Sequence, residues 1–143
     1  MTDSGPAGPP PITELVAALY PALARGDRPT VTSLVDPDFE GTLTGGLPGG
    51  VGGVHHGRDD MIENGWWALG RLFSVRAEPC QWMVCPDGRL LVVGRYVGCG
   101  RASGAPLDAA FVHLWSAEAG RLTAVWQLTD SVRFVEALEG TNQ

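Results

Sequence analysis

The sequence contains no lysine, because all ten of its basic residues are arginine. This absence excludes Schiff-base chemistry and a lysine nucleophile. It also excludes the nucleotide-binding loop in which a lysine contacts the β- and γ-phosphates. Positive charge is scarce overall, since the formal net charge is -6. An acidic chain repels a nucleic-acid backbone, so we expect no nucleic-acid partner.

Cysteine is also sparse, and the spacing of Cys80, Cys85 and Cys99 contains no CxxC pair. An odd number of cysteines with this spacing indicates neither a disulfide framework nor a zinc site. We therefore expect a reduced, cytoplasmic compartment. His55 and His56 are adjacent and lack the helical i, i+4 spacing of a metal pair, so we expect no metal.

The length of 143 residues fits one domain with a substantial hydrophobic core. Residues 1–11 are rich in glycine and proline and lack the apolar run of a signal peptide or membrane anchor, so we expect no membrane association. The predicted organisation is a disordered tail over 1–11, a single domain over 12–138 and a short tail over 139–143.

Helical periodicity dominates the first half of the domain. Apolar residues from Ile12 to Leu23 predict a first helix that ends near Gly26. A short second helix is predicted over residues 29–35, because proline is favoured at a first helical position and Pro37 limits its end. A third helix is predicted from Asp59 to Phe73, with an apolar stripe along one side.

Alternating patterns of period two follow the third helix and predict strands. The predicted strands are residues 39–44, 74–79, 81–85, 89–99, 107–116 and 121–130. Residues 132–138 fit either a final helix or a covering strand. Helices followed by hairpin-connected strands indicate an α+β fold with an antiparallel sheet and helices on one face. A strongly curved sheet would wrap the helices into a cone whose mouth is a ligand pocket.

The glycine-rich segment over residues 43–57, LTGGLPGGVGGVHHG, does not fit a phosphate site. It has no lysine, and its best GxGxxG frame has His55 where the third glycine belongs. Glycines without this spacing supply backbone freedom, so the segment is either a flexible connection or a lid beside a pocket.

Two carboxylates are candidate catalytic groups. Asp38 lies where the second helix gives way to a strand, and Glu63 shares a helix flank with Trp66 and Trp67 if the period is 3.6 residues. Such a pair in one apolar cavity can have unequal pKa values, which suits acid-base catalysis. The alternatives are an aspartate that binds local backbone amides and a solvated glutamate. Asp108 is a further catalytic candidate.

Aromatic and polar residues supply candidates for substrate binding. His113 lies in a strand between Phe111 and Trp115 and is either a hydrogen-bonded core residue or a substrate contact. A subset of the aromatic residues lining the pocket would select a large, mostly apolar substrate. The candidate substrate-binding residues are Tyr20, Trp66, Trp67, His113, Trp126 and Asp130.

The order of these features resembles a known family. The two helices, the turn at Asp38, the helix start at Gly57-Arg58-Asp59 and the final AGRLTAVWQLTD over residues 119–130 resemble the SnoaL-like branch of the NTF2-like superfamily. The resemblance covers residues 12–138. It implies an NTF2-like cone, with a curved antiparallel sheet around about three N-terminal helices. It also implies a homodimer or pairing with a related paralogous subunit.

Within that branch, DPDF over residues 36–39, GGLP over 45–48 and the segment from Asp59 to Trp67 look most like the epoxide hydrolase/cyclases of polyether ionophore biosynthesis. The resemblance implies that Asp38 and Glu63 are the functional pair. It also implies a linear polyether polyketide as substrate, opened at an epoxide by an internal hydroxyl group to give a cyclic ether.

Two other functions remain open at the level of sequence. A pyran-forming cyclase or dehydratase would use Asp38 with Asp108 on an unsaturated acyl chain. A non-catalytic NTF2-like module would hold an apolar ligand or pair with another subunit. The epoxide hydrolase/cyclase and the pyran-forming cyclase both require only acid-base chemistry, so we expect no cofactor.

Overall fold

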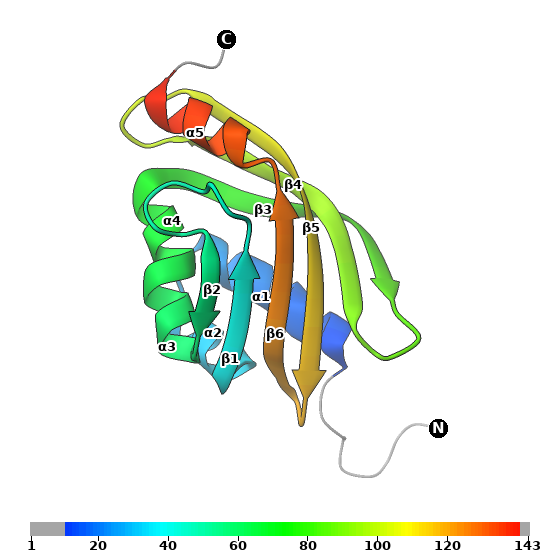
Figure 1. Ribbon diagram of the computed structural model, residues 1–143. Helices are drawn as coiled ribbons and strands as arrows, with labels where there is room; N and C mark the ends of the chain where they lie inside the picture. The colour runs from blue at the N-terminus through cyan, green and yellow to red at the C-terminus, as the bar shows by residue number, and fades with distance from the viewer. Residues whose placement is uncertain (1–10, 141–143) are drawn as a thin grey trace.

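The computed structural model describes residues 11–140 (Figure 1). The tail predicted for residues 1–11 therefore lies outside the described residues except for Pro11. The second predicted tail is described only at Glu139 and Gly140. No helix of the described chain has the length and apolar character needed to cross a membrane.

Two helices open the fold. Helix α1 (Ile12–Ala24) continues through Pro21, and α2 (Arg28–Leu34) follows after a short turn. Asp27 caps α2, because its carboxylate accepts hydrogen bonds from the Thr30 amide at 3.2 Å and from the Thr30 hydroxyl at 2.7 Å. The inward face of α1 contributes buried residues including Val16, Leu19 and Tyr20.

The third predicted helix is continuous but not uniformly α-helical. It consists of α3 (Arg58–Asp60), the π-helical segment η1 (Met61–Trp66) and α4 (Trp67–Leu72). A π-helical turn has i→i+5 hydrogen bonds and so rotates the residues after it relative to a regular α-helix. The sequence-based placement of Glu63 on the flank of Trp66 and Trp67 assumed a constant period of 3.6, which this segment does not have.

Six strands form one curved, open sheet in the order β2-β1-β6-β5-β4-β3. Every neighbouring pair is antiparallel except β1 and β6, which are parallel, so the antiparallel sheet expected from the sequence contains one parallel pair. The strands are β1 (Val35–Leu43), β2 (Gly53–His56), β3 (Phe73–Val84), β4 (Leu90–Gly100), β5 (Pro106–Glu118) and β6 (Arg121–Thr129).

Three sequence-based assignments differ from the structure. Strand β1 begins at Val35 and not at residue 39, so Asp38 lies within the strand and not at its start. The two segments predicted as separate strands at 74–79 and 81–85 form the single strand β3, with a register shift between Pro79 and Gln81. The glycine-rich segment contains the short edge strand β2, which pairs with β1. Its glycines masked this strand because they interrupt the alternation on which strand prediction relies.

Residues Ser131–Glu139 form helix α5, which settles the choice left open for the C-terminal segment. Gly140 ends the helix in the left-handed conformation, with φ of 76°. Phe134 packs against Phe73 and Tyr96, with ring centroids 5.4 and 5.5 Å apart. Helix α5 therefore closes one end of the sheet.

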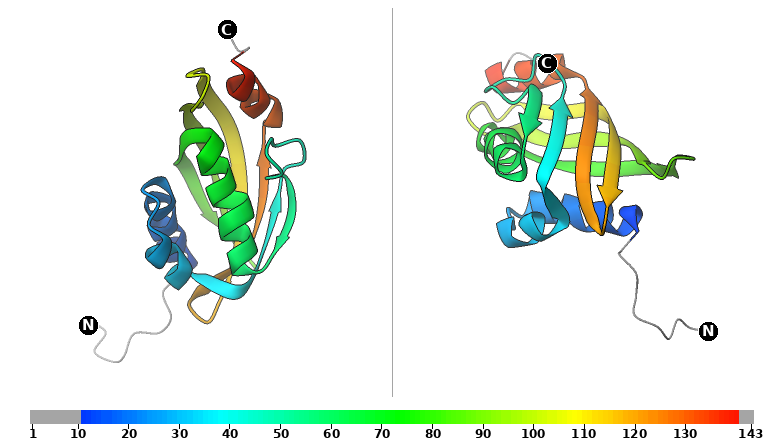
Figure 2. Two further views of the ribbon diagram at one scale, coloured as in Figure 1. Left: turned by 90° about the vertical axis from the view of Figure 1, so that its left-hand side faces the viewer. Right: turned by 60° about the horizontal axis from the view of Figure 1, so that its bottom comes forward.

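The helices α1, α2 and α3–α4 lie on one side of the curved sheet (Figure 2). Side chains alternate across each strand, so Phe111, His113 and Trp115 of β5 point into the core under these helices. The same alternation turns Trp126 and Leu128 of β6 to the opposite face, where 46% and 51% of each residue are exposed. This arrangement is the α+β cone expected from the sequence.

Candidate functional site

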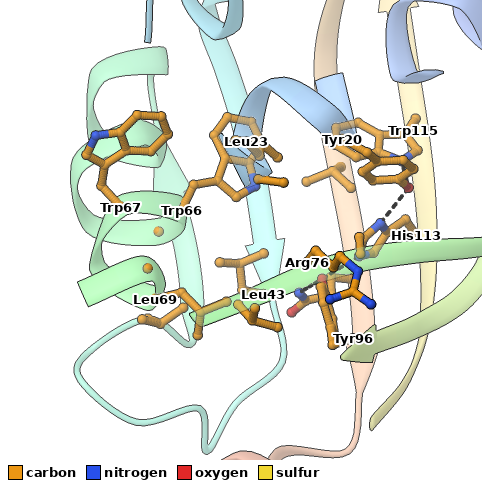
Figure 3. Close-up of a pocket in the computed structure, with 18 residues that line it drawn as sticks. Tyr20, Leu23, Leu43, Trp66, Trp67, Leu69, Arg76, Tyr96, His113 and Trp115 are labelled. Atoms are coloured by element: carbon orange, nitrogen blue, oxygen red, sulfur yellow. Dashed lines mark hydrogen bonds between the residues drawn. The ribbon is translucent and has the colours of Figure 1, made fainter. Parts of the chain in front are cut away.

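A mainly apolar pocket lies between the helices and the inner face of the sheet (Figure 3). Its volume is about 90 Å³, smaller than the roughly 300–1,000 Å³ typical of ligand pockets. The pocket alone therefore accommodates only a short part of a large ligand. Its apolar walls are formed mainly by Leu23, Leu43, Val51, Trp66, Trp67, Leu69, Val75, Ala77 and Val125.

A wider groove of about 380 Å³ continues from the pocket to the surface. The groove also carries Arg25, Arg71 and Arg101. A long ligand can therefore have one segment in the pocket and the rest in the groove. The two cavities share Leu23, Ala24, Trp66, Trp67, Gly70 and Val75.

A buried hydrogen-bond network forms the polar wall of the pocket. The hydroxyl oxygen of Tyr20 lies 2.8 Å from His113 Nδ1, and that of Tyr96 lies 2.6 Å from His113 Nε2 (Figure 3). The indole N–H of Trp115 donates to Tyr20 at 3.1 Å, and the Gln127 amide donates to Tyr96 at 2.6 Å. The network thus links α1 with three neighbouring strands.

The orientation of the Gln127 amide follows from its other partner. The backbone N–H of Thr44 donates to Gln127 Oε1 at 3.2 Å, so the nitrogen of the amide must face Tyr96. The indole N–H of Trp115 is likewise a donor only and cannot accept a hydrogen bond. Both phenolic oxygens therefore accept a hydrogen bond from a group that cannot accept one in return.

Burial keeps the members of this network uncharged. Removal from water lowers the pKa of His113 from 6.5 to about 3, because the imidazolium form loses its hydration. Burial also raises the pKa values of Tyr20 and Tyr96, and hydrogen bonds from Trp115 and Gln127 oppose part of that effect. At neutral pH the network consists of two phenols and a neutral imidazole.

The neutral network contains one hydrogen more than its internal contacts use. Tyr20, Tyr96 and the imidazole each carry one hydrogen, whereas the contacts of His113 with the two phenols use two. If His113 donates to Tyr20, Tyr96 donates to His113 and the hydroxyl hydrogen of Tyr20 is left over. The other tautomer leaves the hydrogen of Tyr96. No further acceptor for either hydroxyl is found within residues 11–140, so one phenolic O–H has no acceptor in the described part of the chain.

The three predicted catalytic carboxylates do not line this pocket. Asp38 is exposed on β1, and its amide donates to Asp36. The side chain of Glu63 is 48% exposed and forms an ion pair with Arg28. That of Asp108 is 57% exposed on the outer face of the sheet and pairs with Arg95 at 2.7 Å. The expected meeting of Asp38 and Glu63 in one cavity is therefore not found.

The predicted substrate-binding residues divide between the two faces of the sheet. Tyr20, Trp66, Trp67 and His113 line the pocket, and their roles in binding remain predictions. Trp126 points away from the pocket, since its neighbours Val125 and Gln127 occupy the inner face. Asp130 lies at the start of α5, with its carboxylate 3.7 Å from Arg133 and 52% of its side chain exposed.

Besides Arg76, two polar lining residues, Tyr96 and Gln127, were not proposed from the sequence. Both occupy inward positions on their strands, as does His113. A polar side chain at a strand position that faces the core must have a hydrogen-bond partner there. The sequence of each strand shows such a polar residue at an inward position. It does not show how α1, β4, β5 and β6 pack together, and this packing brings the polar groups into contact.

The glycine-rich segment is held beside the pocket. Val51 lines the cavity, and His55 Nε2 lies 2.7 Å from the Val51 carbonyl oxygen. His55 is only 5% exposed, and its Nδ1 lies 3.5 Å from the carboxylate of Asp60. Within residues 11–140, no three histidine, cysteine or acidic side chains are grouped so that they could hold a metal ion.

Comparison with known proteins places the chain in a family. The profile of the SnoaL-like domain matches residues 16–125, which is most of the chain. This protein belongs to the SnoaL-like domain family. Among curated proteins, none matches the sequence significantly.

Solved structures of an NTF2-like protein and of two other proteins share the fold. An NTF2-like protein of unknown function from Burkholderia pseudomallei is 26% identical, with a TM-score of 0.78 over 88% of this chain and 95% of that chain. TerC, co-crystallised with polyporic acid, is 25% identical, with a TM-score of 0.78 over 89% and 97% of the two chains.

IdmH from Streptomyces antibioticus, named as a candidate polyketide cyclase, is 20% identical to this SnoaL-like protein. Its TM-score is 0.70 over 89% of this chain and 97% of that chain. At this identity the similarity shows the fold alone. The match to the SnoaL-like profile and these three solved structures together confirm the NTF2-like architecture.

Proposed function

We propose that this SnoaL-like protein is a polyketide cyclase that closes a cyclic ether by opening an epoxide with an internal hydroxyl group. The observation that carries the proposal is the uncommitted phenolic O–H at the wall of an apolar pocket. The name of IdmH supports a polyketide substrate, and the co-crystal of TerC is an example of this fold obtained with an organic ligand.

The chemistry of epoxide opening explains the need for such a donor. Negative charge develops on the epoxide oxygen as its C–O bond breaks, and a positioned O–H group stabilises that charge. Positioned proton transfer contributes typically about 10²- to 10⁴-fold to a rate. A water-poor site strengthens this interaction further.

The apolar walls supply the second requirement. A reaction between two groups of one flexible chain depends on the conformer that brings them together. Trp66, Trp67 and Leu69 from the third helix face Tyr20, His113 and Trp115 across the pocket (Figure 3). In our proposal these side chains hold a folded segment of the substrate, and the adjoining groove accommodates the rest of it.

In this mechanism, phenolic groups take the roles that the sequence had suggested for the carboxylates. Asp38→Asn and Glu63→Gln should therefore retain turnover, since both side chains are exposed outside the pocket. Loss of turnover in either variant, with the fold intact, would show that the substituted carboxylate takes part in the mechanism.

The direct test uses a 4,5-epoxyalkan-1-ol that carries an aryl group at its far end. Ring closure leaves the mass unchanged, whereas hydrolysis adds water, so mass spectrometry separates the two reactions. NMR connectivity then distinguishes a five-membered from a six-membered ring. We expect accelerated closure to one ring size. Consumption of a matched hydroxy-enone instead would identify a pyran-forming cyclase, and binding without conversion of either compound would identify a ligand-binding module.

We also propose that two copies associate through the outer face of the sheet. The SnoaL-like resemblance implies a homodimer, and this face carries the exposed side chains of Trp126, Leu128 and Val54. Exposed apolar groups of this kind favour association when they form a contiguous patch.

A further inference from the structure

We propose that Tyr20, His113 and Tyr96 form a proton relay that connects the two reacting ends of the substrate. One phenol protonates the epoxide oxygen while the other receives the proton of the attacking hydroxyl group. The inference rests on the proposed function, and it adds that the acid and the base are two ends of one network.

The geometry permits direct transfer along the whole path. Both nitrogens of His113 are engaged at the same time, at 2.8 Å from the Tyr20 oxygen and 2.6 Å from the Tyr96 oxygen. These separations are those of ordinary hydrogen bonds between oxygen and nitrogen. All three side chains also line the pocket, and in our proposal both phenolic oxygens contact the bound ligand there.

The protons balance without leaving a charge on the protein. In the starting tautomer, His113 donates from Nδ1 to Tyr20, and Tyr96 donates to Nε2. Tyr20 gives its hydroxyl proton to the epoxide oxygen as the C–O bond breaks, and it receives the Nδ1 proton. The imidazole receives the Tyr96 proton at Nε2. Tyr96 receives the proton of the substrate hydroxyl as the new C–O bond forms.

The end groups of the network confine the relay to the two phenols and His113. Trp115 and Gln127 only donate to the phenolic oxygens, so neither phenol can pass its proton outward to them. The leftover proton is therefore directed to the pocket. A charged intermediate is costly in this buried position, whereas a concerted shift along the relay avoids one.

A turnover inverts the network. Afterwards Tyr20 donates to Nδ1, Nε2 donates to Tyr96, and the leftover proton belongs to Tyr96. The two states differ only in the imidazole tautomer and in which phenol faces the ligand with its hydrogen. The relay therefore requires both tautomers of His113 to be accessible in the folded protein.

The kinetic test compares Tyr20→Phe, Tyr96→Phe and the double variant on the aryl 4,5-epoxyalkan-1-ol. Removal of either phenol interrupts the same path, so each single variant should lower kcat by about 10²-fold or more, and the double variant by a similar factor. Glu118→Gln, at the exposed end of β5, is the surface control and should retain wild-type kcat. Circular dichroism and thermal melts verify that the variants are folded under the assay conditions.

The outcomes separate the relay from the function. Effects of the two single variants that multiply in the double variant would overturn the relay, as would wild-type kcat in one single variant. Turnover by the protein would then still support the cyclase. No conversion of the epoxide by the wild-type protein would overturn the proposed function itself.

A second measurement tests the relay without any substrate. The ¹⁵N chemical shifts of the His113 ring distinguish the two neutral tautomers from the imidazolium ion. We expect averaged shifts from two exchanging neutral tautomers at pH 7. A single fixed tautomer or an imidazolium ion would refute the relay, even if the protein were a cyclase. In mixtures of light and heavy water, the rate of wild-type turnover should vary non-linearly with the deuterium fraction of the solvent, since several protons move together. A linear dependence would count against the relay.

Discussion

The buried ring of His113 predicts a loss of stability in weak acid. Burial lowers its pKa from 6.5 to about 3 in the folded protein, whereas the unfolded chain exposes the ring to water at its ordinary pKa. Between these two values the unfolded state binds one more proton than the folded state. Stability should therefore fall as the pH is lowered from 6.5 towards 3, and should be unaffected by this group above that window.

The size of the effect follows from the two pKa values. Each pKa unit corresponds to about 1.4 kcal/mol, so full protonation of the unfolded chain would cost the folded state roughly 5 kcal/mol. Between pH 7.5 and 5 the expected loss is about 2 kcal/mol. Carboxylates interfere at lower pH, because hydrogen bonds hold the pKa values of Asp27, Asp60 and Asp87 below normal, and their stabilisation is lost as those groups protonate.

Urea unfolding at several pH values between 7.5 and 5 measures this loss. His113→Gln is the matched variant, because it retains a polar side chain at the position but does not titrate, while His55 and His56 contribute equally to both proteins. The wild-type protein should lose about 2 kcal/mol more than the variant over this range. Parallel pH profiles would refute the reasoning.

The ring can also be followed directly, which covers the case of a variant that does not fold. Tyr20, Tyr96, Phe111 and Trp115 pack against His113, and none of them is charged in this range. The pocket that His113 lines is also lined by the charged side chain of Arg76. NMR of the folded wild-type protein should show no titration of this ring above pH 5. A midpoint near 6.5 would show that the ring is not held neutral by burial.

Further predictions concern backbone packing, the network and association. Gly98→Ala should destabilise the protein by about 1–3 kcal/mol, because its Cβ would collide with the Ser74 carbonyl, whereas Gly70→Ala has open space in a helix and should be neutral or stabilising by up to about 1 kcal/mol; thermal melts compare the two. Gln127→Met should cost about 1–3 kcal/mol in urea unfolding, because buried polar partners lose their bonds. Trp126→Arg should halve the mass seen in sedimentation, and an unchanged mass would reject the outer face as the interface.

The fold was largely predictable from the sequence, since the positions of Ile12 to Leu23 and the alternation in β4, β5 and β6 are local patterns. Two of the misses have local causes. Glycines concealed β2, and the π-helical turn at Met61–Trp66 has no signature in the 3.6-residue period. The parallel pairing of β1 with β6 depends on segments about eighty residues apart, which local patterns do not report.

The composition and order of residues by themselves determined the chemistry that is excluded, the α+β class and the resemblance to SnoaL-like proteins. Only the tertiary structure decided which polar groups share the pocket. Acidic side chains can remain hydrated at the surface at little cost, so nothing forces Asp38, Glu63 and Asp108 inward. His113 lies in the core and must find partners there, and the meeting of α1 with β4, β5 and β6 provides them.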